Sequence, residues 1–251
     1  MPRLRPLLSS AIRSAAREAG PDPDAARRHA EWSARWGERE TIEALHGPRG
    51  RLLRRELAAE LDDLLSAAEL ALDRGDAALA TGCLVGAAEL FAVRSGLSKL
   101  DPLIARTMPI AGRSDRGRLL RIRAQGQLAA GDADPAEATL RSAALDLDDP
   151  STAWEAARVW SDLGIVLGRA ARTVEAETAF ECALRQARSC GARRLEAVIR
   201  GNRGFFVYGH GRLHEASEEL SVAVAALERA GDDRMRAGFL GNLGLVCREL
   251  G

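Results

Sequence analysis

Residues 160–183 read WSDLGIVLGRAARTVEAETAFECA, and the spacing of this stretch returns further along the chain. Gly164, Gly204 and Gly244 are each separated by 40 residues. A segment rich in Ala and Glu, with one large apolar residue in its middle, follows each of the first two glycines. A fixed period of this length is typical of stacked helical units, because one unit buries its apolar face only against a neighbour.

The repeated pattern resembles the tetratricopeptide repeat. It consists of two runs, Trp160-x2-Leu163-Gly164-x2-Leu167 and Ala176-x3-Phe180-x2-Ala183. The resemblance implies an all-α fold, a right-handed α-solenoid of antiparallel helical hairpins whose paired helices approach most closely at the glycine and alanine positions. The second repeat departs from the pattern, since Arg200 and Arg203 stand where it prefers Trp and Leu.

The rest of the chain also reads as helix. Ala, Leu, Arg and Glu dominate and β-branched residues are sparse, which favours helix nearly everywhere. Short breaks rich in Gly, Pro and Asp divide the chain into about twelve helices with no sheet. The apolar patch 205–208 resembles a strand, but its place in the repeat predicts helix. Four residues are expected to anchor packing: Trp32, Trp36, Trp154 and Trp160.

The repeat is clear only in the C-terminal part of the chain, so the sequence predicts two regions. We expect irregular helical hairpins in 1–114 and the repeats in 115–251. The expected units of the second part are a degenerate repeat at 115–150, repeats at 152–191 and 192–231, and a half repeat at 232–251. The half repeat should leave Leu240, Leu243 and Val246 partly uncovered. This predicts either a truncated chain or a homo-oligomer formed through the helix at 232–250.

A second resemblance concerns the N-terminal part. Residues 27–32 (RRHAEW) and 56–65 (ELAAELDDLL) resemble the segment that joins the ATPase core to tetratricopeptide repeats in bacterial STAND-type (NB-ARC-like) signalling ATPases. That resemblance implies the sensor arm of such a protein. Lys99 is the only lysine, so the chain contains no G-x-x-x-x-G-K-[ST] loop, and we expect no nucleotide cofactor.

Charge and cysteine usage bound the class of protein. The 36 Lys and Arg balance the 36 Asp and Glu, which argues against a general binder of polyanions. The arginine run at 112–123 makes nucleic-acid binding a third hypothesis, although a solvated helix face more often explains such a run. Four scattered cysteines and the lack of a long apolar run predict a cytoplasmic protein with reduced thiols and no membrane segment.

The sequence offers no catalytic or metal-binding set. His210 and His214 have helical ligand spacing, but they lie in a predicted turn, where histidines are usually solvated. No G-x-S-x-G elbow is present. The acidic pairs at 62–63, 148–149 and 232–233 are explained by capping and by the helix dipole. We therefore expect a non-catalytic protein without metal or cofactor.

The candidate binding residues lie on the expected inner face of the first helix of each repeat. Asp162, Asn202 and Asn242 each precede the repeat glycine by two residues. An asparagine amide both donates and accepts, so it can bridge the backbone of an extended peptide. The predicted site comprises Arg158, Asp162, Ile165, Arg169, Asn202, Phe205, Tyr208, Asn242, Leu245 and Arg248. The expected function is a protein–protein interaction module that binds a peptide or partner helix. The alternative is the sensor arm of a STAND-type ATPase or transcriptional regulator.

Overall fold

A computed structural model describes residues 23–94 and 96–251, and all the regular structure in these ranges is helical. The N-terminal helices are α2 (Pro23–Ala34), α3 (Arg39–Leu45), α4 (Gly50–Ala59), α5 (Leu61–Asp73), α6 (Ala77–Arg94) and α7 (Asp101–Thr107). They are followed by α8 (Arg113–Ala130), α9 (Ala133–Asp146), α10 (Ala153–Arg169), α11 (Thr173–Ser189), α12 (Arg193–Tyr208), α13 (Leu213–Ala230) and α14 (Asp233–Leu250). Short 3-10 turns lie at Arg35–Gly37, Leu97–Leu100 and Pro150–Thr152. The prediction of an all-α chain is confirmed for this part.

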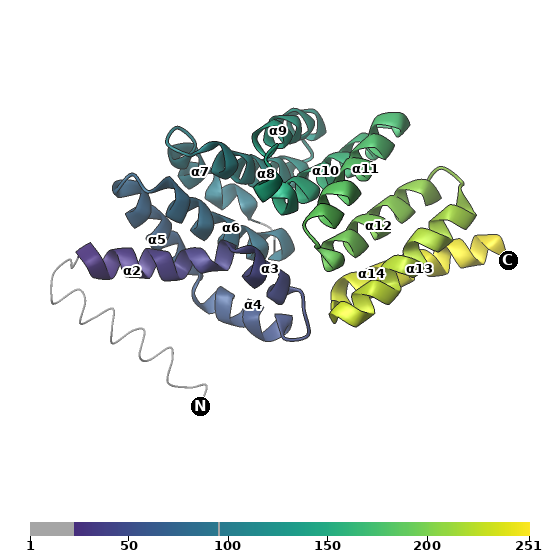
Figure 1. The fold of residues 1–251 in the computed structure, drawn as a ribbon, viewed down its shortest axis with the longest axis horizontal. Coiled ribbons are helices and arrows are strands. Elements are labelled where there is room, and N and C mark those ends of the chain that lie inside the picture. Colours follow the sequence, from purple (N-terminus) through teal and green to yellow (C-terminus); the bar gives the residue numbers. More distant parts are fainter. Residues whose placement is uncertain (1–22, 95) are drawn as a thin grey trace.

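Helices α8 to α14 pack in chain order. α8 packs on α9, α10 on α11, α12 on α13, and α13 on α14, while α10 also contacts α9 and α12 (Figure 1). Residues 205–208 belong to α12, so the helical prediction for this patch is confirmed. Two of the acidic pairs supply a side chain that caps a helix start, as predicted. Asp149 accepts a hydrogen bond from the Ser151 amide at 2.8 Å, and Asp232 accepts one from the Met235 amide at 3.1 Å.

The repeat glycines seat large side chains from the following helix. A Cβ atom at Gly164 would lie 2.9 Å from the Phe180 ring, and one at Gly204 would lie 2.9 Å from Leu220. Phe180 is completely buried. Only glycine leaves room for such a contact, which explains why this residue type recurs at these positions.

Helix α6 is the centre of the N-terminal part. Every residue from 80 to 88 is buried, because α2, α5, α8 and the turn at Arg35–Gly37 surround this helix. One continuous hydrophobic cluster extends from Ile42 through Leu84 and Leu119 to Ile199. The N-terminal helices and the helices that follow them therefore share one core.

A very close approach of two backbone segments lies beside α6. A Cβ atom at Gly37 would lie 2.1 Å from the carbonyl oxygen of Gly82. Because the obstructing atom belongs to the backbone, Gly37→Ala is expected to lower the free energy of unfolding by about 3 kcal/mol in urea denaturation. The control is Gly238→Ala on α14, where an added Cβ meets nothing within 4 Å. A Gly37→Ala protein as stable as this control would show that α6 and the turn are not so tightly joined.

Two packing predictions were wrong. Trp32 is 57% exposed, because α2 turns Ala30 and Ser33 inward and the Trp32 indole outward, where the Arg35 guanidinium lies 5.3 Å from it. Trp154, by contrast, is buried as expected. Val246 is also buried, because it lies two helical turns after Phe239 on the face of α14 that packs in the cluster with α12 and α13. Leu240, on the other side of α14, is exposed.

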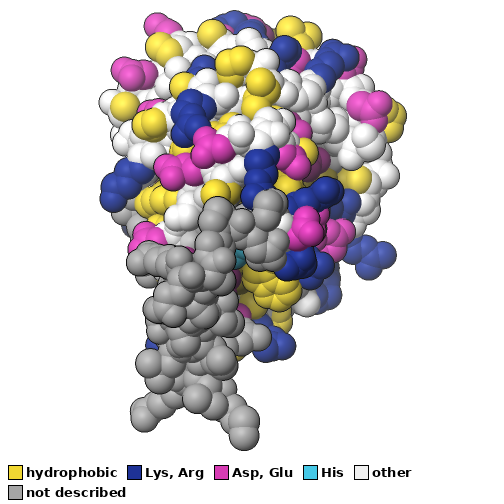
Figure 2. Space-filling model, turned by 90° about the vertical axis from the view of Figure 1, so that its left-hand side faces the viewer, with side chains coloured by type: hydrophobic (Ala, Val, Ile, Leu, Met, Phe, Trp, Pro, Cys, Tyr) yellow, Lys and Arg dark blue, Asp and Glu magenta, His cyan; other side chains and the backbone are white. Residues whose placement is uncertain are grey.

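The surface mixes charge types. Figure 2 shows basic, acidic and apolar side chains interspersed over the face that corresponds to the left-hand side of Figure 1. Within the described ranges, none of the helices combines the length and the apolar composition needed to cross a bilayer.

Candidate functional site

The predicted binding residues, which we call the inner ladder, lie on three helices. Arg158, Asp162, Ile165 and Arg169 are on α10, Asn202, Phe205 and Tyr208 on α12, and Asn242, Leu245 and Arg248 on α14. The structure divides the inner ladder into two unlike halves. Around α10, Glu89 of α6 and Arg121 of α8 pair with ladder side chains. On α12 and α14, several ladder side chains are open to solvent.

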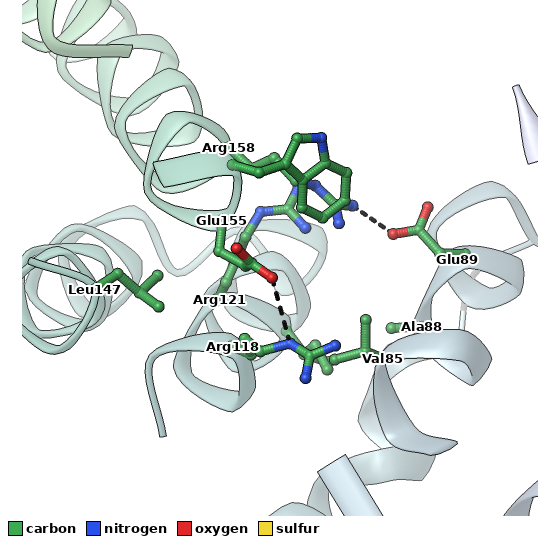
Figure 3. Close-up of a pocket in the computed structure, with 10 residues that line it drawn as sticks. Val85, Ala88, Glu89, Arg118, Arg121, Leu147, Glu155 and Arg158 are labelled. Carbon is green, nitrogen blue, oxygen red and sulfur yellow. Dashed lines mark hydrogen bonds and ion pairs between the residues drawn. The ribbon is translucent and has the colours of Figure 1, made fainter. Parts of the chain in front are cut away.

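In the first half, the ladder residues form ion pairs inside the protein. Arg158 is paired with Glu89 of α6, as Figure 3 shows. Asp162 is paired with Arg121 of α8, with Nε and Oδ2 2.9 Å apart. These four side chains are largely buried, so Arg158 and Asp162 connect helices rather than face solvent.

Electrostatics keeps this cluster charged. Burial by itself would raise the pKa of Glu89, but the Arg158 and Arg121 guanidinium groups and a hydrogen bond with His46 hold that pKa well below its usual range. Burial would likewise lower the pKa of Arg158, and the facing Glu89 carboxylate raises it instead. Carboxylate and guanidinium thus stabilise each other in the interior.

The space between α6, α8 and α10 is too small for a ligand. It is a cavity of about 20 Å³, lined by polar side chains such as Glu89 and Arg158 and by apolar ones such as Val85 and Leu147 (Figure 3). A volume of this size holds about one water molecule. The ionic cluster is therefore a connection between helices and not a small-molecule pocket.

A second chain of contacts joins α3 to the later helices. Trp154 Nε1 donates a hydrogen bond to Glu43 Oε1 at 2.9 Å, and Glu43 is also paired with Arg194 of α12. Arg194 Nη1 in turn lies 2.9 Å from Oδ2 of Asp232, which caps α14. Since Glu43 and Arg194 are 151 residues apart, no local spacing in the sequence indicates this contact.

In the second half, the ladder is open. Phe205 is 51% exposed, and its ring centroid lies 6.2 Å from that of Tyr208 in a tilted arrangement. The Tyr208 hydroxyl donates to Glu249 Oε1 of α14 at 2.5 Å, and this hydrogen bond raises the pKa of Tyr208. Leu245 is exposed one turn before Glu249. Aromatic and aliphatic side chains of two adjacent helices are thus available to a partner.

The remaining ladder residues have intermediate or exposed positions. Asn202 Nδ2 donates to Ser161 Oγ at 3.3 Å, which leaves its carbonyl oxygen for other contacts. Asn242 is half-buried, and Arg169 and Arg248 are exposed. Ile165 is half-buried and packs against the shared core.

The histidine and cysteine side chains do not assemble a metal site. His210 Nε2 lies 3.0 Å from Thr173 Oγ1, and His210 Nδ1 lies 2.9 Å from the Phe206 carbonyl oxygen. Across 23–94 and 96–251, no three His, Cys, Asp or Glu side chains lie close enough to hold a metal ion. The four cysteines are free, and burial raises the pKa of Cys83 to about 12, which leaves it an unreactive thiol.

Most arginines of the run at 112–123 have acidic partners. Arg113 and Arg116 contact Asp146, and Arg116 does so at 2.7 Å. Arg118 lies near Asp115 and Glu155, and Arg121 is paired with Asp162. This pairing reduces the positive charge that a nucleic acid would meet.

Comparison with known proteins adds no family to this description. Neither a protein-family model nor a curated protein matches the chain. The geometry of the two halves of the ladder is therefore the basis for the function proposed below.

Proposed function

We propose that this protein is a non-catalytic interaction module with a tetratricopeptide-like, right-handed α-solenoid arrangement, which binds a peptide or a partner helix on the inner surface of α12 and α14. One observation carries the proposal. Phe205 is about half exposed at an inner ladder position, whereas Ile165, its equivalent 40 residues earlier, packs against the core. An exposed aromatic side chain on a rigid helix is a common anchor in protein interfaces.

The chemistry of the surface specifies the ligand. Phe205 and Leu245 offer apolar contact area, and the amides of Asn202 and Asn242 can donate to and accept from an extended backbone. Arg248 is exposed beside them and complements a carboxylate. The expected ligand is therefore a short segment with a large apolar residue and a nearby acidic one.

The proposed site is shorter than the full ladder. Arg158 and Asp162 are already engaged by Glu89 and Arg121, so their part is to hold α10 in place. A surface of this kind would serve equally in the sensor arm of a STAND-type ATPase or transcriptional regulator. We place such a module in the cytoplasm.

The test is a peptide-library selection against the full chain, followed by affinity measurements on the selected peptides. Phe205→Ala is expected to weaken binding by about tenfold or more, because it removes the central apolar contact. Asn202→Ala together with Asn242→Ala should weaken it further. The matched control is Val222→Ala on α13, which removes an equally exposed apolar side chain away from the ladder.

Two results would contradict the proposal. One is a selected peptide whose affinity is the same for Phe205→Ala as for the wild-type protein. The other is an equal loss in Val222→Ala, which would indicate a general change of the protein. Circular dichroism of each variant establishes that the helices remain intact.

A further inference from the structure

Helix α14 carries a second apolar face, distinct from the inner ladder. It consists of Leu240, Leu243, Gly244 and Cys247, and we call it the α14 outer face. The positions one 40-residue period earlier, on α12, lie against α13, and those two periods earlier, on α10, lie against α11. The α14 outer face thus continues a series of two helix-to-helix interfaces present within the chain.

Burial shows how completely the first two faces are covered. Leu167 and Val207 are buried, whereas Cys247, at the same position of α14, is exposed. Gly164 and Gly204 each receive a large side chain from the next helix, but a Cβ atom at Gly244 would meet nothing within 4 Å. Leu240 is 43% exposed. Leu243 is half-buried beside the cluster that α12, α13 and α14 form, so the open part of the face is Leu240, Gly244 and Cys247, which no helix of the described structure covers.

Charge distinguishes which kind of helix the face fits. On α12, Arg203 pairs with Glu219 and Glu215 of α13, at 2.7 and 2.6 Å. On α14, Leu243 replaces this arginine, so a helix like α13 would bury an acidic side chain without a partner, which is unfavourable.

Helix α11 lacks one of these two acidic side chains, and the other, Glu175 at the position of Glu215, pairs with Arg172 and Arg141. Helix α11 carries Ala179 where α13 has Glu219, directly before the large residue that sits on the glycine. It packs on α10, where Trp160 and Leu163 are apolar like Leu240 and Leu243 of α14. The apolar character of the α14 outer face therefore matches an α11-type helix.

We propose that the α14 outer face docks an amphipathic helix of a partner, with the chemistry of α11. Such a helix places an aromatic or leucine side chain on Gly244, carries alanine or another small residue one turn to either side, and has no acidic residue directly before the large one. None of the inner-ladder residues belongs to the α14 outer face, so this docking site is separate from the proposed peptide site.

The probe is a synthetic peptide with the sequence of residues 173–190 and the changes Cys182→Ser and Cys190→Ser, added to the 251-residue chain. The two serines leave the peptide without a thiol, so it neither consumes the alkylating reagent nor duplicates the Cys182 fragment of the protein. Because Cys247 lies on the proposed surface, its alkylation rate, followed by peptide mass spectrometry, reports on docking. Saturating peptide is expected to slow alkylation of Cys247 at least fivefold, while Cys182 is unaffected. A peptide with Phe180→Ala should give no protection, and the α13 sequence 213–230 should protect less.

A matched pair of protein variants tests whether the side chain of the docked helix occupies the space at Gly244. Gly244→Leu fills the position of the incoming side chain and should abolish protection, measured as the ratio of rates with and without peptide. Gly238→Leu is the control, since this glycine is equally open but lies on another side of α14. Phe205→Ala should leave protection unchanged, which separates this result from the test of the inner surface.

Three outcomes would overturn the proposal. The first is an unchanged alkylation rate at every soluble peptide concentration. The second is protection that persists in Gly244→Leu. The third is protection of Cys247 without peptide that increases with protein concentration, because a second copy of the chain would then cover the face.

Discussion

Replacing Glu89 by glutamine is expected to lower the free energy of unfolding by about 3–5 kcal/mol at pH 7. The substitution keeps the size of the side chain but removes its charge, so the buried Arg158 guanidinium loses the carboxylate with which it is paired. Arg121 contributes a second positive charge close by, and its partner Asp162 balances only one of the two. Urea denaturation followed by circular dichroism measures the effect.

The same residue gives the protein a specific response to acid. In the unfolded chain Glu89 titrates near 4.5, whereas in the folded protein Arg158, Arg121 and His46 face it and its pKa lies well below that value. A carboxyl group whose pKa is lowered by folding stabilises the fold above its unfolded pKa, and this contribution is lost as the pH falls toward the folded pKa. Below about pH 5 the wild-type protein should therefore lose stability more steeply than Glu89→Gln.

A control separates the buried pair from ordinary surface charge. Asp73 and Arg106 form an exposed pair at 3.0 Å, so Asp73→Asn is expected to cost less than about 1 kcal/mol. Equal losses in Glu89→Gln and Asp73→Asn, or identical pH slopes for wild type and Glu89→Gln, would contradict the role assigned to the buried cluster.

The elements that could be predicted from the sequence are those specified by local spacing. The helical course of 160–183 and the seating of Phe180 on Gly164 follow from a period of 40 residues and from the size of glycine. From 77 to 88, helix α6 contains only small or apolar residues, and such a pattern indicates a buried helix without identifying what buries it.

The contacts that divide the site could not be predicted in this way. Glu89 and Arg158 are 69 residues apart, and Trp154 and Glu43 are 111 apart. A single sequence contains no spacing rule that links such positions. Arg158 therefore reads as a ladder residue in the sequence, whereas the structure places it in a buried ion pair.

Replacing Phe180 by alanine is the second substitution with a large expected effect, about 3–5 kcal/mol in the free energy of unfolding. Phe180 is fully buried on α11 and sits on Gly164 of α10. Its ring centroid lies 5.6 Å from that of Phe206 of α12. Because one ring joins three helices, its loss leaves a cavity that no single side chain can fill. Val174→Ala on the same helix, at a position 77% exposed, should change stability by no more than about 0.5 kcal/mol.

A double-mutant cycle shows whether the ring acts through the glycine. Gly164→Ala alone should destabilise the protein by about 1–3 kcal/mol, because its Cβ would lie 2.9 Å from the Phe180 ring. In the Phe180→Ala background the same change should be neutral or stabilising, since the obstruction is gone and alanine favours helix by about 1 kcal/mol. Gly244→Ala, whose Cβ meets no atom within 4 Å, should be stabilising in the wild-type background. Equal costs for Gly164→Ala in both backgrounds would mean that the glycine is present for another reason, and the equivalence of Gly164 and Gly244 on which the α14 outer face depends would fail with it.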